Sequence, residues 1–133
     1  MTDNLKYLSD EWRIEAEKRL RESLSPEKMN HLTSSMSNIY KNCPDGMQHF
    51  IFMRYEEGKL AEFLTGTGEV PTAEFAITGD YEVFARITRS ELASHKALMT
   101  GKLKLKGNMV KALKLASLAD RINKVFATIP ATY

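Results

Sequence analysis

The hydrophobic period of the sequence changes between residues 42 and 47, and this change restricts the chain to folds that combine helices with a sheet. Before it, apolar residues recur at three- and four-residue steps, as on one face of a helix. The segment 42–46, Asn-Cys-Pro-Asp-Gly, holds a proline and a glycine and interrupts the pattern. After it, the apolar residues follow the two-residue period of strands. We therefore expect an α+β fold.

Two helices are predicted before the interruption. The first covers residues 5–24, where charged residues separate the apolar positions. Ser25, Pro26 and Glu27 then have the order of a cap, a first helical residue and an acidic first turn. The second helix is therefore expected to begin there, and its buried stripe is predicted to be Met29, Leu32, Met36 and Ile39.

Three strands are predicted after the interruption. Residues 48–55 and 60–65 are expected to form a hairpin around the turn at Gly58. Residues 73–78 alternate in the same way and are expected to form the third strand. Because the connections are short, the order of these strands predicts an antiparallel meander.

The rest of the chain alternates helix and strand. Asp80 is positioned to cap one helix and Ser94 a shorter one. Lys102–Lys106 alternates lysine and leucine between two glycines, as a strand does. Asn108 then caps a closing helix over residues 109–126, which is apolar over a wide arc. Such an arc indicates either a helix buried on two sides or one that borders a cavity, and the residues alone leave both open.

Length, charge and composition exclude several classes of protein. The 133 residues fit one domain, 1–133, and the formal net charge of +2 is too low for a nucleic-acid-binding surface. We find no apolar run long enough to span a membrane and no apolar core of a signal peptide at the start. The final Pro-Ala-Thr-Tyr is not a peroxisomal address, and a single cysteine suits a reducing compartment. We therefore expect a cytoplasmic protein without a nucleic-acid partner.

The sequence contains no signature of catalysis or metal binding. His31, His49 and His95 are scattered, and none has a partner at the spacing of metal ligands. Cys43 has no basic neighbour in the sequence that would activate it, so we interpret it as a passive thiol. We expect no catalytic residue, no metal and no cofactor, and hence a protein that is not an enzyme.

One window of the chain resembles a known family. Residues 97–109 read Ala-Leu-Met-Thr-Gly-Lys-Leu-Lys-Leu-Lys-Gly-Asn-Met and lead into a helix with Ala112 and Leu115 at three-residue spacing. This order of short helix, G-K-L-K strand, second glycine, cap and helix resembles the C-terminal signature of the sterol carrier protein 2 family. Residues 77–84 also fit the strand-to-helix entry of that family. The resemblance extends over roughly residues 45–126.

The resemblance implies a curved, mainly antiparallel five-stranded sheet, covered on one face by helices, with an apolar tunnel between the two layers. It divides the chain into N-terminal helices over residues 1–45, which cover or line the tunnel, and a sterol-carrier-like core over residues 46–127. The periodicity shows four strands, so a fifth is expected in 68–72 or 86–91.

The resemblance further implies that the chain binds and carries a fatty acid, a fatty acyl-CoA, a sterol-like lipid or a phospholipid. We expect lysines on one face of the 102–106 strand either to contact lipid headgroups or to form a solvated surface: Lys102, Lys104 and Lys106. The side chains expected to line the tunnel are Phe84, Ile87, Leu98, Met99, Leu103, Leu105, Met109, Ala112, Leu113 and Ala116.

Two other functions stay open. One is a protein-interaction or dimerisation module that serves a separately encoded lipid-metabolising enzyme and uses the helix over residues 5–24 as its contact surface. The other, with less support, is an enzyme subunit that acts on lipid or acyl-CoA, for which the sequence offers no nucleophile or base. The partners to consider are therefore the lipid, a membrane surface contacted transiently, and a second copy of the chain.

Overall fold

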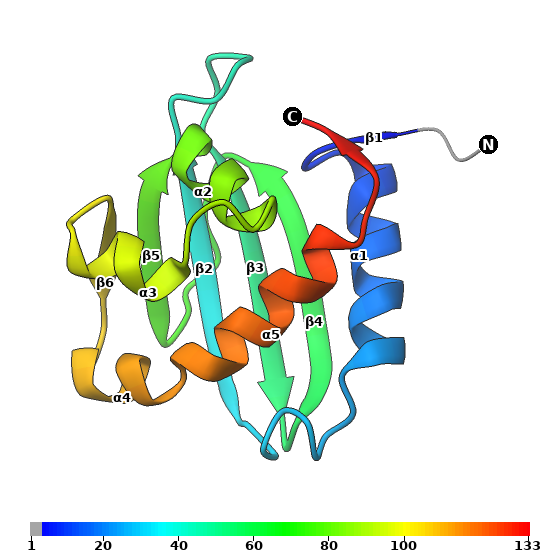
Figure 1. Cartoon of the computed structure of the whole chain (residues 1–133), viewed down its shortest axis with the longest axis vertical. Helices are drawn as coiled ribbons and strands as arrows, with labels where there is room; N and C mark the ends of the chain where they lie inside the picture. Colours follow the sequence, from blue (N-terminus) through cyan, green and yellow to red (C-terminus); the bar gives the residue numbers. More distant parts are fainter. Residues whose placement is uncertain (1–3) are drawn as a thin grey trace.

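Strand β2 (Ser34–Lys41) lies at the centre of a five-stranded sheet in the computed structural model, which describes residues 4–133 (Figure 1). On one side β3 (His49–Glu56) and β4 (Lys59–Thr67) follow in antiparallel pairing. On the other side β5 (Phe75–Asp80) is parallel to β2, and β6 (Leu103–Lys106) is antiparallel to β5. The predicted α+β fold with a mainly antiparallel five-stranded sheet is confirmed.

The second predicted helix is wrong over its whole length, because residues 34–41 form β2 and the residues before them form turns. Its apolar residues Met36 and Ile39 have the three-residue spacing of a helix stripe, but three serines and an asparagine separate and flank them. Serine and asparagine side chains form hydrogen bonds with the nearby backbone and are poor helix formers. Backbone pairing with β3 on one side and β5 on the other stabilises the strand instead. The fifth strand is therefore β2, and neither 68–72 nor 86–91 supplies it.

Residues 25–33 form turns that rest against the tip of the β3–β4 hairpin. The amide of Gly58 donates to the Leu32 carbonyl at 2.8 Å. Gly58 has φ +83°, and a Cβ there would lie 2.6 Å from the Pro26 carbonyl oxygen. Pro26 thus packs against Gly58, at a position that only glycine can occupy. It lies in a turn and does not begin a helix, contrary to the prediction.

The hairpin of β3 and β4 is confirmed, but the predicted meander is wrong. After β4 the chain crosses the sheet and β5 pairs with β2, beginning beside Met36. Two serines of β2 hold this crossing: Ser37 Oγ donates to the Pro71 carbonyl and Ser35 Oγ accepts from the Glu74 amide, both at 2.8 Å. A parallel pair requires such a crossover, whereas a short turn can join only antiparallel strands.

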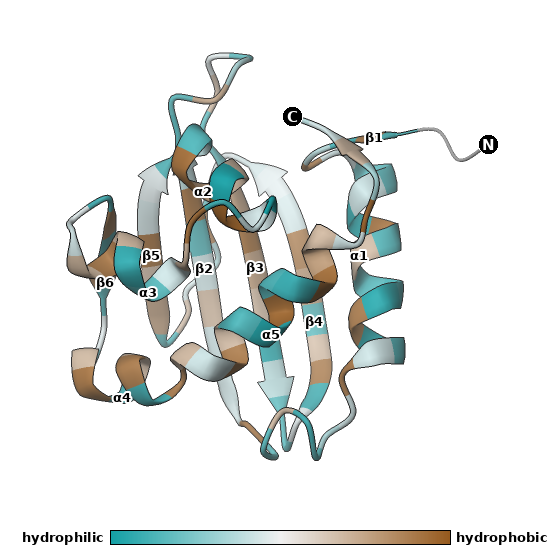
Figure 2. Ribbon diagram, in the orientation of Figure 1, coloured by the Kyte–Doolittle hydropathy of each residue, from teal (hydrophilic) through white to brown (hydrophobic). Residues whose placement is uncertain are grey.

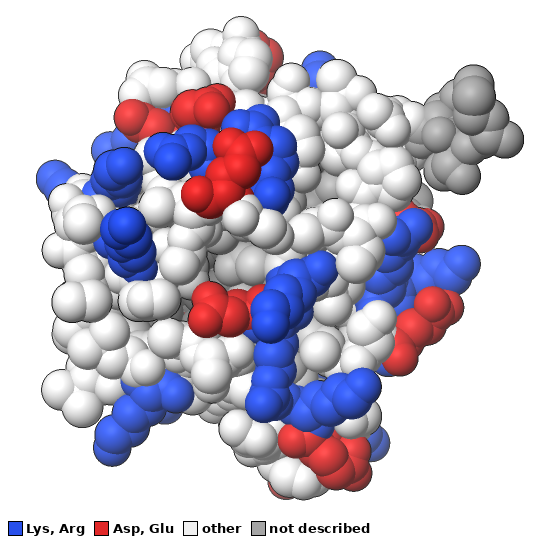
Figure 3. Space-filling view, viewed as in Figure 1, with Lys and Arg blue, Asp and Glu red and all other residues white. Residues whose placement is uncertain are grey.

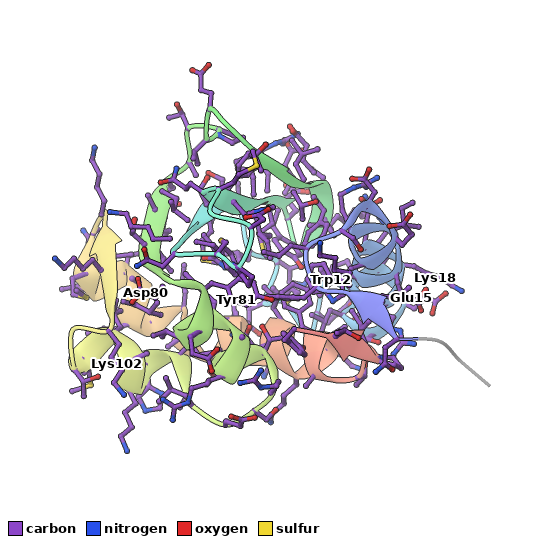
Figure 4. All side chains as sticks on the ribbon, turned by 90° about the horizontal axis from the view of Figure 1, so that it is seen from above. Trp12, Glu15, Lys18, Asp80, Tyr81 and Lys102 are labelled. Atoms are coloured by element: carbon purple, nitrogen blue, oxygen red, sulfur yellow. The ribbon has the colours of Figure 1, made fainter. Side chains whose placement is uncertain are left out.

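Helix α1 (Asp10–Ser23) confirms the first predicted helix over a shorter range and packs beside β4 and against α5 (Ala116–Ala127). The Ser9 hydroxyl caps it by accepting from the Trp12 amide at 3.2 Å. Figure 4 shows Trp12 on the inner side of α1, whereas Glu15 and Lys18 lie on the outer side. The strands β1 (Leu5–Lys6) and β7 (Ala131–Thr132) pair next to this helix and join the two ends of the chain.

The predicted closing helix is two helices, α4 (Met109–Lys114) and α5. They meet at Leu115, where neither proline nor glycine breaks the chain. The Leu115 amide donates to the carbonyls of both Lys111 and Ala112 at 3.1 Å, which tightens the turn. The consequence is visible in Figure 2, where α4 is largely hydrophobic and projects from the rest of the helical layer. Three of its apolar residues are exposed: Met109, Val110 and Leu113.

The predicted caps have different outcomes. Asn108 caps α4 by accepting from the Lys111 amide at 3.0 Å, as expected. Asp80 precedes α2 (Tyr81–Thr88) but accepts from Asn42 Nδ2 at 2.7 Å and makes no cap bond. Ser94 is the first residue of α3 (Ser94–Met99) rather than its cap, and its hydroxyl donates to Asp120. Within residues 4–133 no helix combines the length and hydrophobicity needed to cross a bilayer.

Candidate ligand-binding cavity

A cavity of about 130 Å³ lies between the sheet and the helices that cover it. Its floor comes from β2, β3, β5 and β6, and its walls come from α2, α3, α4 and α5. Figure 3 shows the helical side of the molecule, where mostly uncharged atoms surround a basic side chain at the position of α4. Apolar side chains form most of the lining, among them Met36, Met53, Ile77, Leu103, Leu105, Phe84, Ile87, Leu98, Leu113, Leu118, Ile122 and Phe126.

The structure brings together most of the residues predicted to line a tunnel. Those that border the cavity are Phe84, Ile87, Leu98, Leu103, Leu105, Ala112, Leu113 and Ala116. Met99 and Met109 do not border it and are 77% and 46% exposed. Leu98 and Met99 are neighbours on α3, so when Leu98 points inward Met99 is turned by about 100° toward solvent. Met109 is the first residue of α4 and shares the exposure of that helix.

Sequence reasoning missed the contribution of β2. Met36, Asn38 and Tyr40 border the cavity from this strand. Their two-residue spacing is the signal that would have placed them on one face of a strand. It was hidden because Met36 and Ile39 also fit a helical stripe.

A cluster of bonded hydroxyls lies at one part of the lining. The Tyr7 hydroxyl is 2.8 Å from that of Tyr40 and 3.0 Å from Thr88 Oγ1. Tyr40 also stacks on Phe84, with ring centroids 4.2 Å apart. Burial raises the pKa of Tyr7 and of Tyr40 well above the ordinary value, so both phenols are neutral at physiological pH. The hydroxyls of this cluster therefore already have hydrogen-bond partners within the protein.

Two other polar atoms of the lining are buried without a hydrogen-bond partner, Asn38 Oδ1 and the Tyr55 hydroxyl. Asn38 lies on the central strand between Ile51 and Ile77, whereas Tyr55 lies opposite Ser34 near the other end of β2. Burial raises the pKa of Tyr55 to about 12, so it too is neutral. A buried polar group without a partner costs about 1–3 kcal/mol, so each of these atoms would gain from a hydrogen bond with a molecule that reached it.

The predicted headgroup lysines lie outside the cavity. Leu103 and Leu105 of β6 border the cavity, and strand alternation directs Lys104 and Lys106 to the opposite face. Lys102, Lys104 and Lys106 are all exposed, and Figure 4 shows Lys102 at the outer margin of the molecule. Nearby, Lys111 Nζ pairs with Glu74 Oε2 at 2.5 Å.

Comparison with known proteins gives one family. The model of the SCP-2 sterol transfer family matches residues 17–120, a range that begins within α1 and ends within α5. The match therefore includes β2 and starts well before residue 45, where the sequence resemblance begins. Among the curated proteins, none matches the chain significantly.

Solved structures with the same fold share little sequence with this chain. A crystal structure of sterol carrier protein 2 superposes with a TM-score of 0.80 at 21% identity, covering 93% of this chain and 99% of its own. A possible sterol carrier protein from Thermus thermophilus gives 0.77 at 19% identity, over 98% and 94%. Palmitated sterol carrier protein 2 like 2 from Aedes aegypti gives 0.60 at 22% identity, over 83% and 93%. These likenesses establish the fold.

Proposed function

The chain belongs to the SCP-2 sterol transfer family, a family of lipid-binding and lipid-transfer domains, and we propose that it carries an amphipathic lipid whose apolar chain occupies the cavity. The observation that carries this proposal is the lining, in which side chains from four strands and four helices face one interior space. The palmitated state of the Aedes aegypti protein supports an acyl chain as the occupant.

The cavity must widen to hold a long chain. Its volume of about 130 Å³ is below the roughly 300–1,000 Å³ of most ligand pockets. Helix α4 is the wall that can move, since it has no buried residue, whereas α5 buries Leu118, Ile122, Val125 and Phe126. Elements with few buried apolar contacts open at low free-energy cost. We infer that the ligand enters by displacing α4.

The energetics of burial suit a carrier. Each methylene group removed from water contributes about 0.8 kcal/mol, so a long acyl chain contributes on the order of 10 kcal/mol before losses. Association, ordering of the chain and displacement of α4 offset much of this. A dissociation constant of roughly micromolar order follows, which allows the protein to release its ligand.

The unpartnered polar atoms give the ligand an orientation. Asn38 Oδ1 can accept a hydrogen bond from a hydroxyl or a protonated carboxyl group, and the Tyr55 hydroxyl can donate or accept one. A lipid with such a group therefore fits the cavity better than a hydrocarbon of equal length. We propose a ligand with a hydrogen-bond donor that reaches Asn38, such as a long-chain alcohol, acid or sterol.

Carriage agrees with the polar chemistry of the cavity better than catalysis does. Tyr7, Tyr40 and Thr88 bond to one another, and the raised pKa values keep the two phenols protonated and unable to act as bases near neutral pH. Ser94, which borders the cavity, donates its hydroxyl hydrogen to Asp120 at 3.1 Å. We therefore propose a binding protein rather than an enzyme.

The interaction-module alternative depended on the apolar face of the first helix. In α1 that face consists of Trp12, Ala16 and Leu20, which are 0%, 0% and 1% exposed. Their contacts are with the rest of the same chain. Because a partner protein cannot reach this face in the folded state, we do not extend the proposal to it.

Filling the cavity should weaken lipid binding. We expect Ala112→Trp to place an indole inside the lining and to raise the dissociation constant for a fluorescent palmitate analogue at least tenfold. Val110→Trp is the matched control, since Val110 lies on the same helix, does not border the cavity and is 64% exposed. Circular dichroism would confirm that both variants fold. Equal affinities for Ala112→Trp and the native chain would contradict the cavity as the binding site.

Asn38 should make the protein prefer a ligand with a hydrogen-bond donor over a similar ligand without one. We expect the native chain to bind hexadecanol about tenfold more tightly than hexadecyl methyl ether, because only the alcohol satisfies Asn38 Oδ1. Asn38→Leu, of similar volume, should remove this preference, whereas Asn123→Leu, which changes another asparagine of the lining, should keep it. Competition against the fluorescent analogue measures all of these affinities. A preference that survives in Asn38→Leu would refute the role of this side chain.

The three exposed lysines of the β6 region are proposed to meet anionic headgroups during transfer. They lie in the sequence between α3 and α4, which expose the apolar residues Met99, Met109, Val110 and Leu113. A basic residue near an anionic membrane contributes about 1 kcal/mol. Changing Lys102, Lys104 and Lys106 to glutamate should slow lipid transfer to phosphatidylserine vesicles by tenfold or more, with little effect on phosphatidylcholine vesicles. Changing Lys41, Lys59 and Lys124 to glutamate is the control. Equal slowing in both triple variants would argue against this surface.

A further inference from the structure

The turn between β2 and β3 brings three potential metal ligands together. One donor atom each from Cys43, Asp45 and His49 lies within 4.8 Å of the others. None of the three borders the lipid cavity. In Figure 1 this turn projects beyond the sheet, at the end where β5 leads into α2. The cluster is therefore separate from the lipid cavity, and its chemistry does not depend on the lipid proposal.

The local backbone explains why these residues converge. Gly46 has φ +76°, and its amide donates to the Cys43 carbonyl at 2.9 Å, which reverses the chain. Asp45 Oδ1 accepts from the Met47 amide at 2.9 Å, which leaves Oδ2 at 2.7 Å from His49 Nε2. The spacing Cys-x-Asp-x-x-x-His follows no common ligand motif, so the partners of His49 could not be recognised before the fold was known.

The rest of the turn holds the cysteine in place. Cys43 is 7% exposed, and its thiol donates to the Tyr40 carbonyl at 3.4 Å. Asn42 Nδ2 donates to Asp80 Oδ1 at 2.7 Å and so ties the turn to the end of β5. Sulfur, carboxylate and imidazole are thus presented from a braced turn rather than from a mobile loop.

We propose that Cys43, Asp45 and His49 form a binding site for a divalent ion of the zinc class. Thiolate, imidazole and carboxylate are the ligands that Zn²⁺ takes, and one thiolate with one carboxylate balances its charge. Tetrahedral zinc holds such donors roughly 3.3–3.6 Å apart, so small rotations of the three side chains suffice to enclose an ion. Three protein ligands leave the fourth position to water or to an added ligand.

Metal binding would join the ends of two floor strands of the lipid cavity. Cys43 follows β2 by two residues, and His49 is the first residue of β3. An ion that binds only the folded chain raises its stability according to the ion concentration. The site therefore has a readout in stability as well as in spectroscopy.

Cobalt titration of the full chain, freed of metal by chelation, tests this site. We expect one equivalent of Co²⁺ to give tetrahedral d–d bands and a thiolate-to-cobalt charge-transfer band, all removed by Zn²⁺. Cys43→Ser should remove the charge-transfer band. Asp45→Asn and His49→Gln should weaken Co²⁺ affinity at least tenfold, and His31→Gln and His95→Gln should not change it. Asp45 and His49 are not fully buried, so their variants are expected to fold.

A second measurement keeps the test decisive if Cys43→Ser does not fold. Excess Zn²⁺ should raise the thermal midpoint of the native chain, and of His31→Gln, but not that of Asp45→Asn. Absence of a charge-transfer band with the folded native chain would overturn the proposal. Equal zinc-dependent stabilisation of the native chain and Asp45→Asn would overturn it as well, because the ion would then bind elsewhere.

Discussion

The cavity depends on the pairing of β2 with two strands that run in opposite directions to each other, β3 and β5. β2 bonds to β3 in antiparallel register and to β5 in parallel register, so it connects two halves of the sheet that have no other contact through strands. The same pairing directs Met36, Asn38 and Tyr40 into the cavity floor. Without β2 the β3–β4 hairpin and the β5–β6 pair would separate, and the helices above them would lose a continuous surface.

The helical layer above this floor is unevenly anchored. α5 crosses the sheet and buries four apolar side chains, whereas α4 buries none and exposes Met109, Val110 and Leu113 (Figure 2). A small interior space beside a weakly held wall is the arrangement that a carrier requires, since the wall can yield to a chain larger than the empty cavity. In our proposal the break at Leu115 is what allows lipid to enter, because it separates the weakly anchored α4 from the firmly anchored α5.

Local sequence patterns predicted correctly those elements that are determined by contacts between residues close in sequence. The hairpin around Gly58, the alternating strand before Gly107 and the cap at Asn108 were all predicted correctly. β2 was not, because Met36 and Ile39 imitate a helix stripe and only pairing with distant strands reveals the two-residue period. The break at Leu115 lies among good helix formers and carries no local signal.

The sequence could indicate only part of the cavity lining, for a related reason. Periodicity indicates which side chains share a face, but whether another element covers that face depends on tertiary contacts. Leu98 and Leu103 therefore face the cavity as predicted, while Met99 and Met109 do not. Asn38 and the cluster of Cys43, Asp45 and His49 were missed because their significance lies in neighbours that only the fold supplies.

The central claim, that a lipid chain occupies the space between sheet and helices, is tested most directly by nuclear magnetic resonance with isotope-labelled hexadecanol. The account predicts intermolecular Overhauser effects from the alkyl chain to methyl groups of Leu103, Leu113 and Ile122, all of which border the cavity. Effects confined to the exposed methyl groups of Met99 and Val110, with none to Leu103 or Ile122, would contradict it.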